Sequence, residues 1–190
     1  MLKEKLQSKA LSMIKQNDRV ALQWCTSLGK SRAAIEAIKY FKTVNNSLRV
    51  LLVVAETAHK SNWEEEFKKW GLDISNVTVE CYASLKKYRD TNWDLIVFDE
   101  AHHLGSDLRM DILSSIKTKK IILLSATLPE QTIQELSSIF GKFAVFSVSL
   151  KRAIDWGILP QPKVFLIPLT LDSTSYNCTI TEEWGKKEKR

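Results

Sequence analysis

Cysteine is scarce in this chain of 190 residues, which has three: Cys25, Cys81 and Cys178. Because they are few, odd in number and far apart, they indicate neither a disulfide framework nor a zinc site. This usage fits a reduced, intracellular setting, either the cytoplasm of a bacterium or phage-infected cell or the nucleus.

Long hydrophobic runs are also missing. The longest covers residues 50–55, whereas a helix that crosses a bilayer needs about 20 apolar residues. The N-terminus reads Met-Leu-Lys-Glu-Lys, with charges where a secretory signal needs an apolar core. No repeat or low-complexity tract is visible. We therefore expect neither a membrane partner nor a targeting segment.

What the chain does contain is an ordinary globular composition with a basic balance. Hydrophobic residues make up 44% and charged residues 26%, which argues against wholesale disorder. The net charge is +6 and the isoelectric point is about 9.2. This balance permits a polyanionic partner such as nucleic acid, but an ordinary solvated basic surface explains the charge equally well.

Short apolar runs alternate with helix-like patterns along most of the chain. The runs do not alternate with polar residues, which is typical of strands buried on both faces of a parallel sheet. The predicted strands are residues 19–24, 48–55, 77–82, 94–98, 120–125 and 143–148. The predicted helices are residues 2–15, 30–41, 62–70, 108–116 and 130–140. This order predicts an α/β fold with a wound, mostly parallel sheet.

The pattern changes near Pro160. Pro160 and Pro162 interrupt it, residues 164–169 form one more strand-like run, and the residues after Leu171 are polar. We expect one domain over residues 1–160 and, over residues 161–190, a linker and the start of a further domain.

The most informative segment joins a predicted strand to a predicted helix through a loop that ends in Gly-Lys-Ser. This is the context of a phosphate-binding loop, in which backbone N–H groups surround the phosphates. Lys30 is expected to reach the outer phosphates and the Ser31 hydroxyl to ligate Mg²⁺. The residues expected to hold the nucleotide are Thr26, Ser27, Leu28, Gly29, Lys30 and Ser31. The alternative is a chance Gly-Lys-Ser at a helix N-terminus.

The loop departs from the usual pattern G-x-x-x-x-G-K-[ST] at its beginning. Trp24 stands where the pattern has its first glycine. Ser27 stands where the commoner form of such a loop has glycine, which leaves the loop conformation, and with it the affinity for ATP, open.

A second motif ends another predicted strand. An apolar run leads into the adjacent carboxylates Asp99 and Glu100, followed by His102 and His103. Wound α/β sheets carry their chemistry at the carboxyl ends of strands. Asp99 is predicted to hold Mg²⁺ and Glu100 to polarise the attacking water as a general base. The alternative is a solvated turn. The histidines are not expected to bind a metal, because no suitably spaced Cys or His lies elsewhere.

The order of these motifs resembles the N-terminal motor domain of superfamily 2 helicases. The acidic box has the DEAH form of the Walker B motif, and residues 125–127, Ser-Ala-Thr, follow a predicted strand as motif III does. The resemblance implies a RecA-like P-loop NTPase, a three-layer sandwich that uses ATP and Mg²⁺. It also implies that His102, Ser125 and Thr127 relay the nucleotide state, although Ser125 and Thr127 would also fit a cap on the next helix.

Other segments resemble the family's contacts with adenine and nucleic acid. Gln7 follows Leu6 where many relatives have Tyr-Gln, so its amide would hydrogen-bond the edge of adenine. The alternative is an exposed helix glutamine. Residues 53–63 resemble motif Ia, and residues 82–85 resemble the segment that precedes the acidic box. The residues expected to contact nucleic-acid phosphates are Thr57, Lys60, Tyr82 and Ser84. The alternatives are a helix capped at Ser61 and a Tyr82 ring in the core.

Residues 153–160 resemble the exit segment that precedes the second motor domain in restriction- and phage-type helicases. The resemblance implies two partners: nucleic acid, DNA more than RNA, and a second RecA-like domain of the same polypeptide. The implied activity is that of an ATP-dependent helicase or translocase, nearly inactive without the second domain. A non-unwinding duplex-DNA translocase and a nucleotide-binding switch or scaffold without turnover remain open. The phosphate loop disfavours a plain nucleic-acid-binding module.

Overall fold

The computed structural model describes residues 2–105 and 107–163. The chain divides into a unit over residues 1–160 and a unit over residues 161–190. The first unit carries all the helices and strands described below. The strand-like run at residues 164–169 lies outside the described residues.

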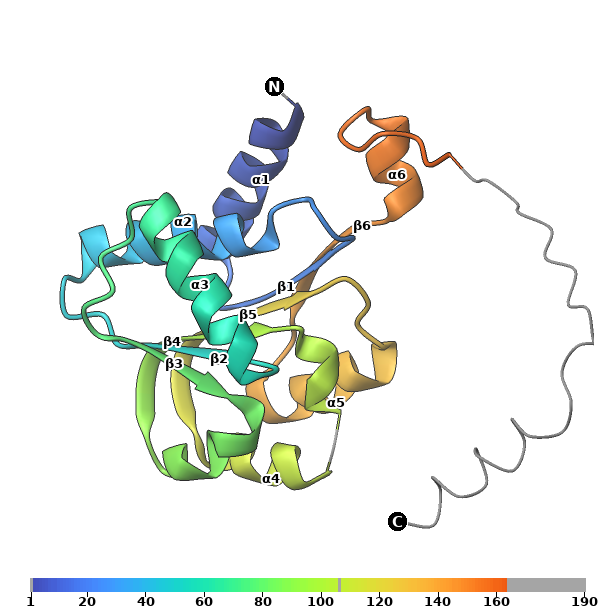
Figure 1. Ribbon diagram of the computed structural model, residues 1–190. Helices are drawn as coiled ribbons and strands as arrows, with labels where there is room; N and C mark the ends of the chain where they lie inside the picture. Colours follow the sequence, from blue (N-terminus) through green and yellow to red (C-terminus); the bar gives the residue numbers. More distant parts are fainter. Residues whose placement is uncertain (1, 106, 164–190) are drawn as a thin grey trace, which may run out of the picture. The chain divides into compact units, whose positions relative to one another are not determined.

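The centre of the first unit is a sheet of six parallel strands (Figure 1). The strands are β1 (Arg19–Trp24), β2 (Val50–Val54), β3 (Val77–Cys81), β4 (Asn92–Asp99), β5 (Lys117–Ser125) and β6 (Ala144–Val148). Their order across the sheet is β3-β2-β4-β5-β1-β6. The prediction of a wound, parallel α/β sheet is confirmed.

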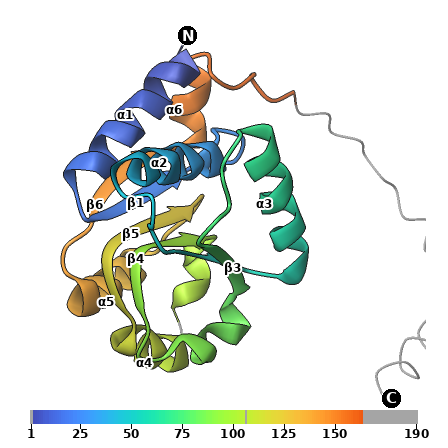
Figure 2. The ribbon, with the colours of Figure 1, turned by 90° about the vertical axis from the view of Figure 1, so that its left-hand side faces the viewer.

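Helices cover both faces of this sheet, which makes three layers (Figures 1 and 2). One face carries α1 (Leu2–Gln16), α2 (Lys30–Val44) and α3 (Thr57–Lys69), with α6 (Leu150–Asp155) packed beside α1. The other face carries α4 (Asp107–Ser115), α5 (Glu130–Phe140) and two short 3₁₀ helices, η1 (Tyr82–Tyr88) and η2 (Ala101–Leu104).

Each face of the sheet has its own apolar core. Along β2, Leu52 and Val54 belong to the core under α1, α2 and α3, whereas Leu51 and Val53 belong to the core over α4 and α5. This alternation follows from the two-residue period of a strand. Because every β2 residue is buried, its sequence is continuously apolar. The edge strands β3 and β6 are only partly buried and carry polar residues.

Several element bounds differ from the sequence-based expectation. The helix expected from residue 62 begins at Thr57, so Ser61 lies inside it and the predicted cap at Ser61 is wrong. Tyr82 was expected to end a strand, but it begins η1, because its ring packs on Phe98 on the second face of the sheet. Strands β4 and β5 both start earlier than expected because their first residues pair with each other, Asn92 with Lys117.

Within the described residues, no helix combines the length and the apolar character that crossing a bilayer requires.

Candidate nucleotide-binding site

The phosphate loop connects the end of β1 to the start of α2 at the carboxyl edge of the sheet. Two of its residues adopt positive φ angles, Ser27 at 66° and Gly29 at 83°. A Cβ atom on Gly29 would lie 2.8 Å from the Gln7 amide nitrogen. Position 29 therefore requires glycine for its backbone conformation and for the close approach of α1.

Hydrogen bonds from three directions hold the loop. Gln7 Nε2 donates to the carbonyl oxygens of Leu28 and Gly29, each at 3.0 Å. Lys3 Nζ donates to the Ser27 carbonyl at 2.8 Å. The Cys25 N–H donates to the Val148 carbonyl on β6 at 3.0 Å. These contacts connect the loop to α1 and to β6.

Trp24, at the position of the usual first glycine, does not face the loop. Its side chain is fully buried in the core under α1 and α2, with its ring edge-on to Phe146 at 5.5 Å between centroids. The unusual residue therefore fills core volume. Ser27 instead carries the departure from the pattern, because it adopts the left-handed conformation that glycine usually provides.

Lys30 and Ser31 open α2 and line a cleft of about 480 Å³. The Lys30 amine donates to the Trp24 carbonyl at 3.0 Å, so it lies against the backbone at the start of its own loop. The residues that line the cleft are Lys3, Thr26, Ser27, Gly29, Lys30, Ser31, Arg32, Glu66, Lys69, Trp70, Asp99 and Glu100. The structure thus brings the phosphate loop and the acidic box, far apart in sequence, into one cleft.

Asp99 ends β4, and Glu100 follows it with a left-handed backbone, φ 48°; both carboxylates line the cleft. Asp99 Oδ1 accepts from the Glu100 N–H at 3.1 Å, and Asp99 Oδ2 accepts from the Trp63 indole N–H at 2.8 Å. Tyr82 Oη donates to the Asp99 carbonyl at 2.8 Å. Glu100 Oε2 lies 3.3 Å from His102 Nδ1.

The electrostatics of Asp99 fit a cation. Burial raises the pKa of Asp99 above its ordinary value, and the nearby Glu100 carboxylate acts in the same direction. The indole hydrogen bond from Trp63 opposes this shift. A carboxylate that burial has deprived of water is stabilised by a bound cation. Mg²⁺ typically takes one or two carboxylates plus phosphate oxygens and water, and Asp99 with Ser31 in a phosphate cleft matches that set.

The predicted relay residues are brought together. His102 Nδ1 lies 3.2 Å from Ser125 Oγ, and Ser125 Oγ donates to the Thr127 carbonyl at 2.6 Å. Ser125 and Thr127 do not cap the next helix, because α5 has Pro129 at its N-cap position without a side-chain cap bond. A chain of contacts therefore runs from Glu100 through His102 to the loop after β5.

Gln7 is buried, with 7% of its surface exposed, so the alternative of an exposed helix glutamine is wrong. Its amide nitrogen donates to the phosphate loop, while its buried Oε1 has no hydrogen-bond partner within the part of the chain that the structure describes. Recognition of adenine by Gln7 stays a prediction. What the structure adds is a direct connection between α1 and the phosphate loop.

The residues predicted to contact nucleic acid lie in varied settings. Lys60 Nζ is paired with Glu80 at 2.6 Å, so a carboxylate already balances its charge. Thr57 Oγ1 lies 3.9 Å from Cys81 Sγ. Tyr82 is 4% exposed and belongs to the core, as the alternative interpretation expected, and Ser84 is half-buried. Nucleic-acid contact by these four residues stays a prediction.

Sequence reasoning missed the contribution of α3 to the cleft. Trp63, Phe67 and Trp70 recur at helical spacing, and Trp63 and Phe67 are buried in the core. Trp63 also bonds Asp99, while Glu66 and Trp70 line the cleft, with the Arg32 guanidinium 4.4 Å from the Trp70 ring centroid. The available signal was that a buried indole N–H usually finds an acceptor.

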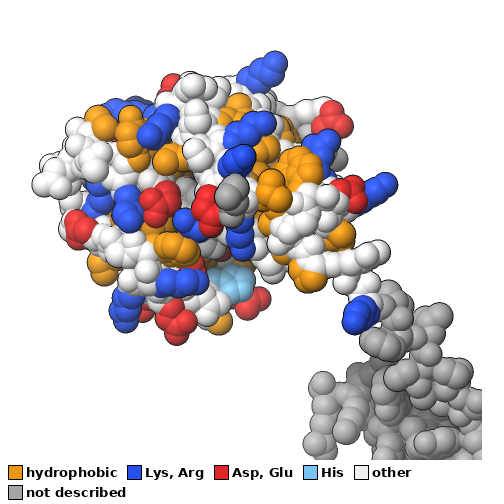
Figure 3. Space-filling view, turned by 90° about the horizontal axis from the view of Figure 1, so that it is seen from above, with side chains coloured by type: hydrophobic (Ala, Val, Ile, Leu, Met, Phe, Trp, Pro, Cys, Tyr) orange, Lys and Arg blue, Asp and Glu red, His pale blue; other side chains and the backbone are white. Residues whose placement is uncertain are grey.

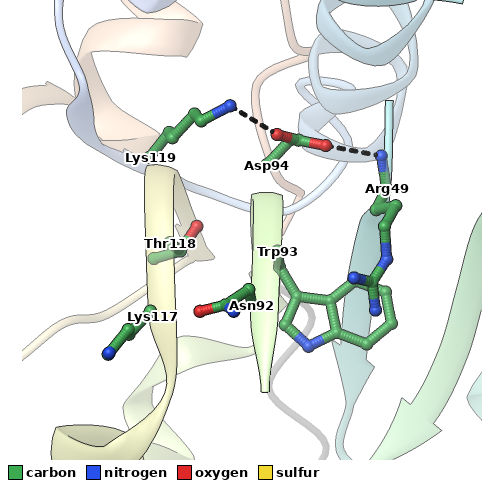
Figure 4. Close-up of a pocket in the computed structure, with 7 residues that line it drawn as sticks. All are labelled: Arg49, Asn92, Trp93, Asp94, Lys117, Thr118 and Lys119. Carbon is green, nitrogen blue, oxygen red and sulfur yellow. Dashed lines mark hydrogen bonds and ion pairs between the residues drawn. The ribbon is translucent and has the colours of Figure 1, made fainter. Parts of the chain in front are cut away.

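A second hollow of about 400 Å³ lies at the opposite, amino ends of β4 and β5 (Figure 4). Its carboxylate, Asp94, is already bound by Lys119 at 2.9 Å and by the Arg49 N–H at 3.0 Å. It contains neither the phosphate loop nor the acidic box, so the cleft at the carboxyl edge is the candidate nucleotide site.

Comparison with known proteins agrees with this geometry. The family model described as "Type III restriction enzyme, res subunit" matches residues 73–130, a range that contains the acidic box and the segment Ser125–Thr127. A protein of Acanthamoeba polyphaga mimivirus that bears the name of an ATP-dependent RNA helicase is 26% identical over 129 residues. Both matches support the resemblance of this chain to the RecA-like domain of superfamily 2 helicases.

Solved structures share the fold of this RecA-like domain. The SWI2/SNF2 ATPase core of Sulfolobus solfataricus, in complex with dsDNA, has a TM-score of 0.62 and 21% identity over 74% of this chain and 35% of that one. The UvsW helicase of bacteriophage T4 has a TM-score of 0.60 and 19% identity over 73% of this chain and 58% of that one. The match to the mimivirus relative covers 64% of this chain but 28% of the relative, so the chain spans about a quarter of that protein's length.

Proposed function

We propose that this domain is the ATP-binding lobe of an ATP-dependent helicase or translocase, which couples hydrolysis of Mg-ATP to movement on nucleic acid. The observation that carries the proposal is the shared cleft of Lys30, Ser31, Asp99 and Glu100. A phosphate loop alone fits many nucleotide-binding proteins. The facing pair of carboxylates adds the metal ligand and the general base that hydrolysis needs.

Each residue has a distinct role in this proposal. The backbone N–H groups of the loop and the Lys30 ammonium hold the phosphates, and the helix N-terminus of α2 adds partial positive charge. Ser31 and Asp99 hold Mg²⁺, which neutralises charge on the phosphates. Glu100 takes the proton of the attacking water and is oriented by His102 at 3.3 Å. His102, Ser125 and Thr127 carry the nucleotide state toward the nucleic acid.

Lys30→Ala tests the phosphate loop. The variant should lose about 2–3 kcal/mol of nucleotide binding, or roughly 30- to 150-fold in affinity, because a charge-assisted contact to phosphate is removed. The melting temperature should change little, since the lysine lines an open cleft. Titration of a fluorescent ATP analogue against both proteins measures this. Equal affinities would remove the assignment of the loop.

Lys42→Ala is the matched control for this experiment. Lys42 lies on the same helix, and its amine also donates to backbone carbonyls, those of Asp73 and Ser75. It does not line the cleft. The analogue should therefore bind the control as tightly as the wild type.

We propose DNA as the nucleic acid and a second RecA-like domain as the protein partner. The similar Sulfolobus structure was solved with dsDNA, whereas the name of the mimivirus relative refers to RNA. ATP hydrolysis by a protein that includes both lobes, measured with DNA and with RNA, distinguishes the two. A forked-duplex unwinding assay then separates a helicase from a translocase that does not unwind.

Nucleic-acid binding by residues 1–190 should be weak, salt-sensitive and indifferent to sequence. Glu80 neutralises Lys60, and the Lys and Arg side chains are scattered over the face seen in Figure 3. If about three phosphates are contacted, affinity for duplex DNA should fall roughly 40-fold between 50 and 200 mM salt. Fluorescence anisotropy with two duplexes of unrelated sequence measures both properties. A strong preference for one duplex at constant salt would contradict the expectation.

A further inference from the structure

The Trp63 indole connects α3 to the carboxylate at the end of β4. Trp63 is 3% exposed, and its ring packs against Phe67 with centroids 5.7 Å apart. From this buried position its N–H donates to Asp99 Oδ2 at 2.8 Å. A hollow of about 200 Å³, lined by Trp63, Ser31 and both carboxylates, adjoins the contact. The indole is thus part of the wall of the site.

The contact orients the carboxylate. The Glu100 N–H holds Asp99 Oδ1 at 3.1 Å and the Trp63 N–H holds Oδ2 at 2.8 Å, so the carboxylate plane is defined by donors on both oxygens. Each carboxylate oxygen has two acceptor positions. One position per oxygen therefore remains for a cation or the water that surrounds it.

Burial alone does not place a carboxylate beside an indole. Trp24 is fully buried in the same core, and its indole N–H meets no carboxylate among the described residues. Trp63 instead lies where its N–H meets the carboxylate that the phosphate loop faces.

We propose that Trp63 is a positioning residue for magnesium, holding Asp99 in the orientation that binds the cation beside Ser31. The inference rests on the proposed function, because it requires that the cleft binds a magnesium nucleotide. Donors that orient metal ligands typically contribute strongly to metal affinity. Trp63 touches neither the phosphates nor the water in this proposal and acts through Asp99.

The test is the dependence of nucleotide affinity on Mg²⁺. We would titrate a fluorescent ATP analogue against residues 1–190 with excess Mg²⁺ and with EDTA. The measured quantity is the dissociation constant in EDTA divided by the dissociation constant in Mg²⁺. In Trp63→Phe this ratio should fall by roughly 10- to 100-fold relative to wild type, the range for loss of a donor to a metal ligand. The affinity in EDTA should stay the same, because Lys30 and the loop are unchanged.

Trp93→Phe is the matched control. Trp93 is also largely buried, at 9% exposed, and its indole donates to Thr91 Oγ1 at 3.0 Å. It lies at the amino end of β4, away from the cleft (Figure 4). The Trp93→Phe variant loses a comparable ring and hydrogen bond, so its ratio of dissociation constants should equal that of the wild type.

Asp99→Asn separates positioning from a general structural effect. If Trp63 acts through Asp99, adding Trp63→Phe to Asp99→Asn should cause no further fall in the ratio. Should Trp63→Phe not fold, site-specific replacement of Trp63 by its benzothiophene isostere removes the N–H while keeping the ring. The same fall in the ratio is expected for this protein.

The outcomes are distinguishable. Suppose that the wild type binds the analogue more tightly with Mg²⁺ and that the Trp63 variant has the same ratio as the wild type. This result would overturn the positioning role and leave the proposed function standing. A wild type that does not bind the analogue, or binds it equally in Mg²⁺ and EDTA, would overturn both.

Discussion

Glu100→Gln is expected to lower the rate of ATP hydrolysis by roughly 10²- to 10⁴-fold, the range for loss of a general base, in a protein that joins this lobe to a second RecA-like lobe. Glu100 projects from a left-handed backbone position after β4, beside His102. Glutamine keeps the size of the side chain but cannot take the proton of the attacking water. The Mg²⁺ ligands assigned to Ser31 and Asp99 are unchanged, so Mg-ATP affinity should be preserved.

Steady-state hydrolysis and analogue binding, measured on the same preparations, check this prediction. Glu65→Gln is the control, because it removes one negative charge from an exposed position on α3 and should leave both quantities unchanged. If Glu100→Gln hydrolyses ATP at a rate near that of the wild type, another residue is the base.

The second large effect is expected from the second lobe. Residues 1–190 should hydrolyse ATP roughly 10³- to 10⁵-fold more slowly than a protein that includes both lobes, the range attributed to an arginine supplied to the transferring phosphate. The cleft that holds Lys30 and Asp99 is formed by one lobe and lies at the carboxyl edge of the sheet, where it is open to water. Water on that side screens the charges of Lys30 and Asp99 and leaves the transition state less stabilised.

Hydrolysis by the short and the long protein should be compared with and without single- and double-stranded DNA and RNA. Nucleic acid should stimulate the long protein, since closure of the cleft between two lobes couples binding to turnover. It should have little effect on residues 1–190. Equal rates for the two proteins would show that the two-lobe mechanism does not apply.

Much of the fold could be predicted because its signals are local. Buried parallel strands read as continuous apolar runs, and β2 is buried at every residue. The phosphate loop and the acidic box are each a short contiguous stretch, so residue types alone indicated that Lys30 follows a strand and that Asp99 ends one. Parallel strands then bring both motifs to one edge of the sheet.

Predictions failed or stayed open where a side chain had more than one possible neighbour. A lysine in a motif Ia-like segment suggested a phosphate contact, but Lys60 meets Glu80 from β3. An aromatic residue before the acidic box suggested a surface contact, but Tyr82 packs on Phe98. In each case the residue type allowed two partners; the structure shows the partner within the protein, and contact with nucleic acid stays a prediction.

The sequence by itself determined the order of strands and helices, the position of the phosphate loop and the pair of carboxylates, because each depends on residues close together in the chain. Only the tertiary structure decided which donors hold those groups. Gln7 reaches the loop from α1, and Trp63 reaches Asp99 from α3, across 36 positions of sequence. The physical reason is that periodicity predicts which side of a helix is buried, whereas the crossing of helices over the sheet determines which atoms meet.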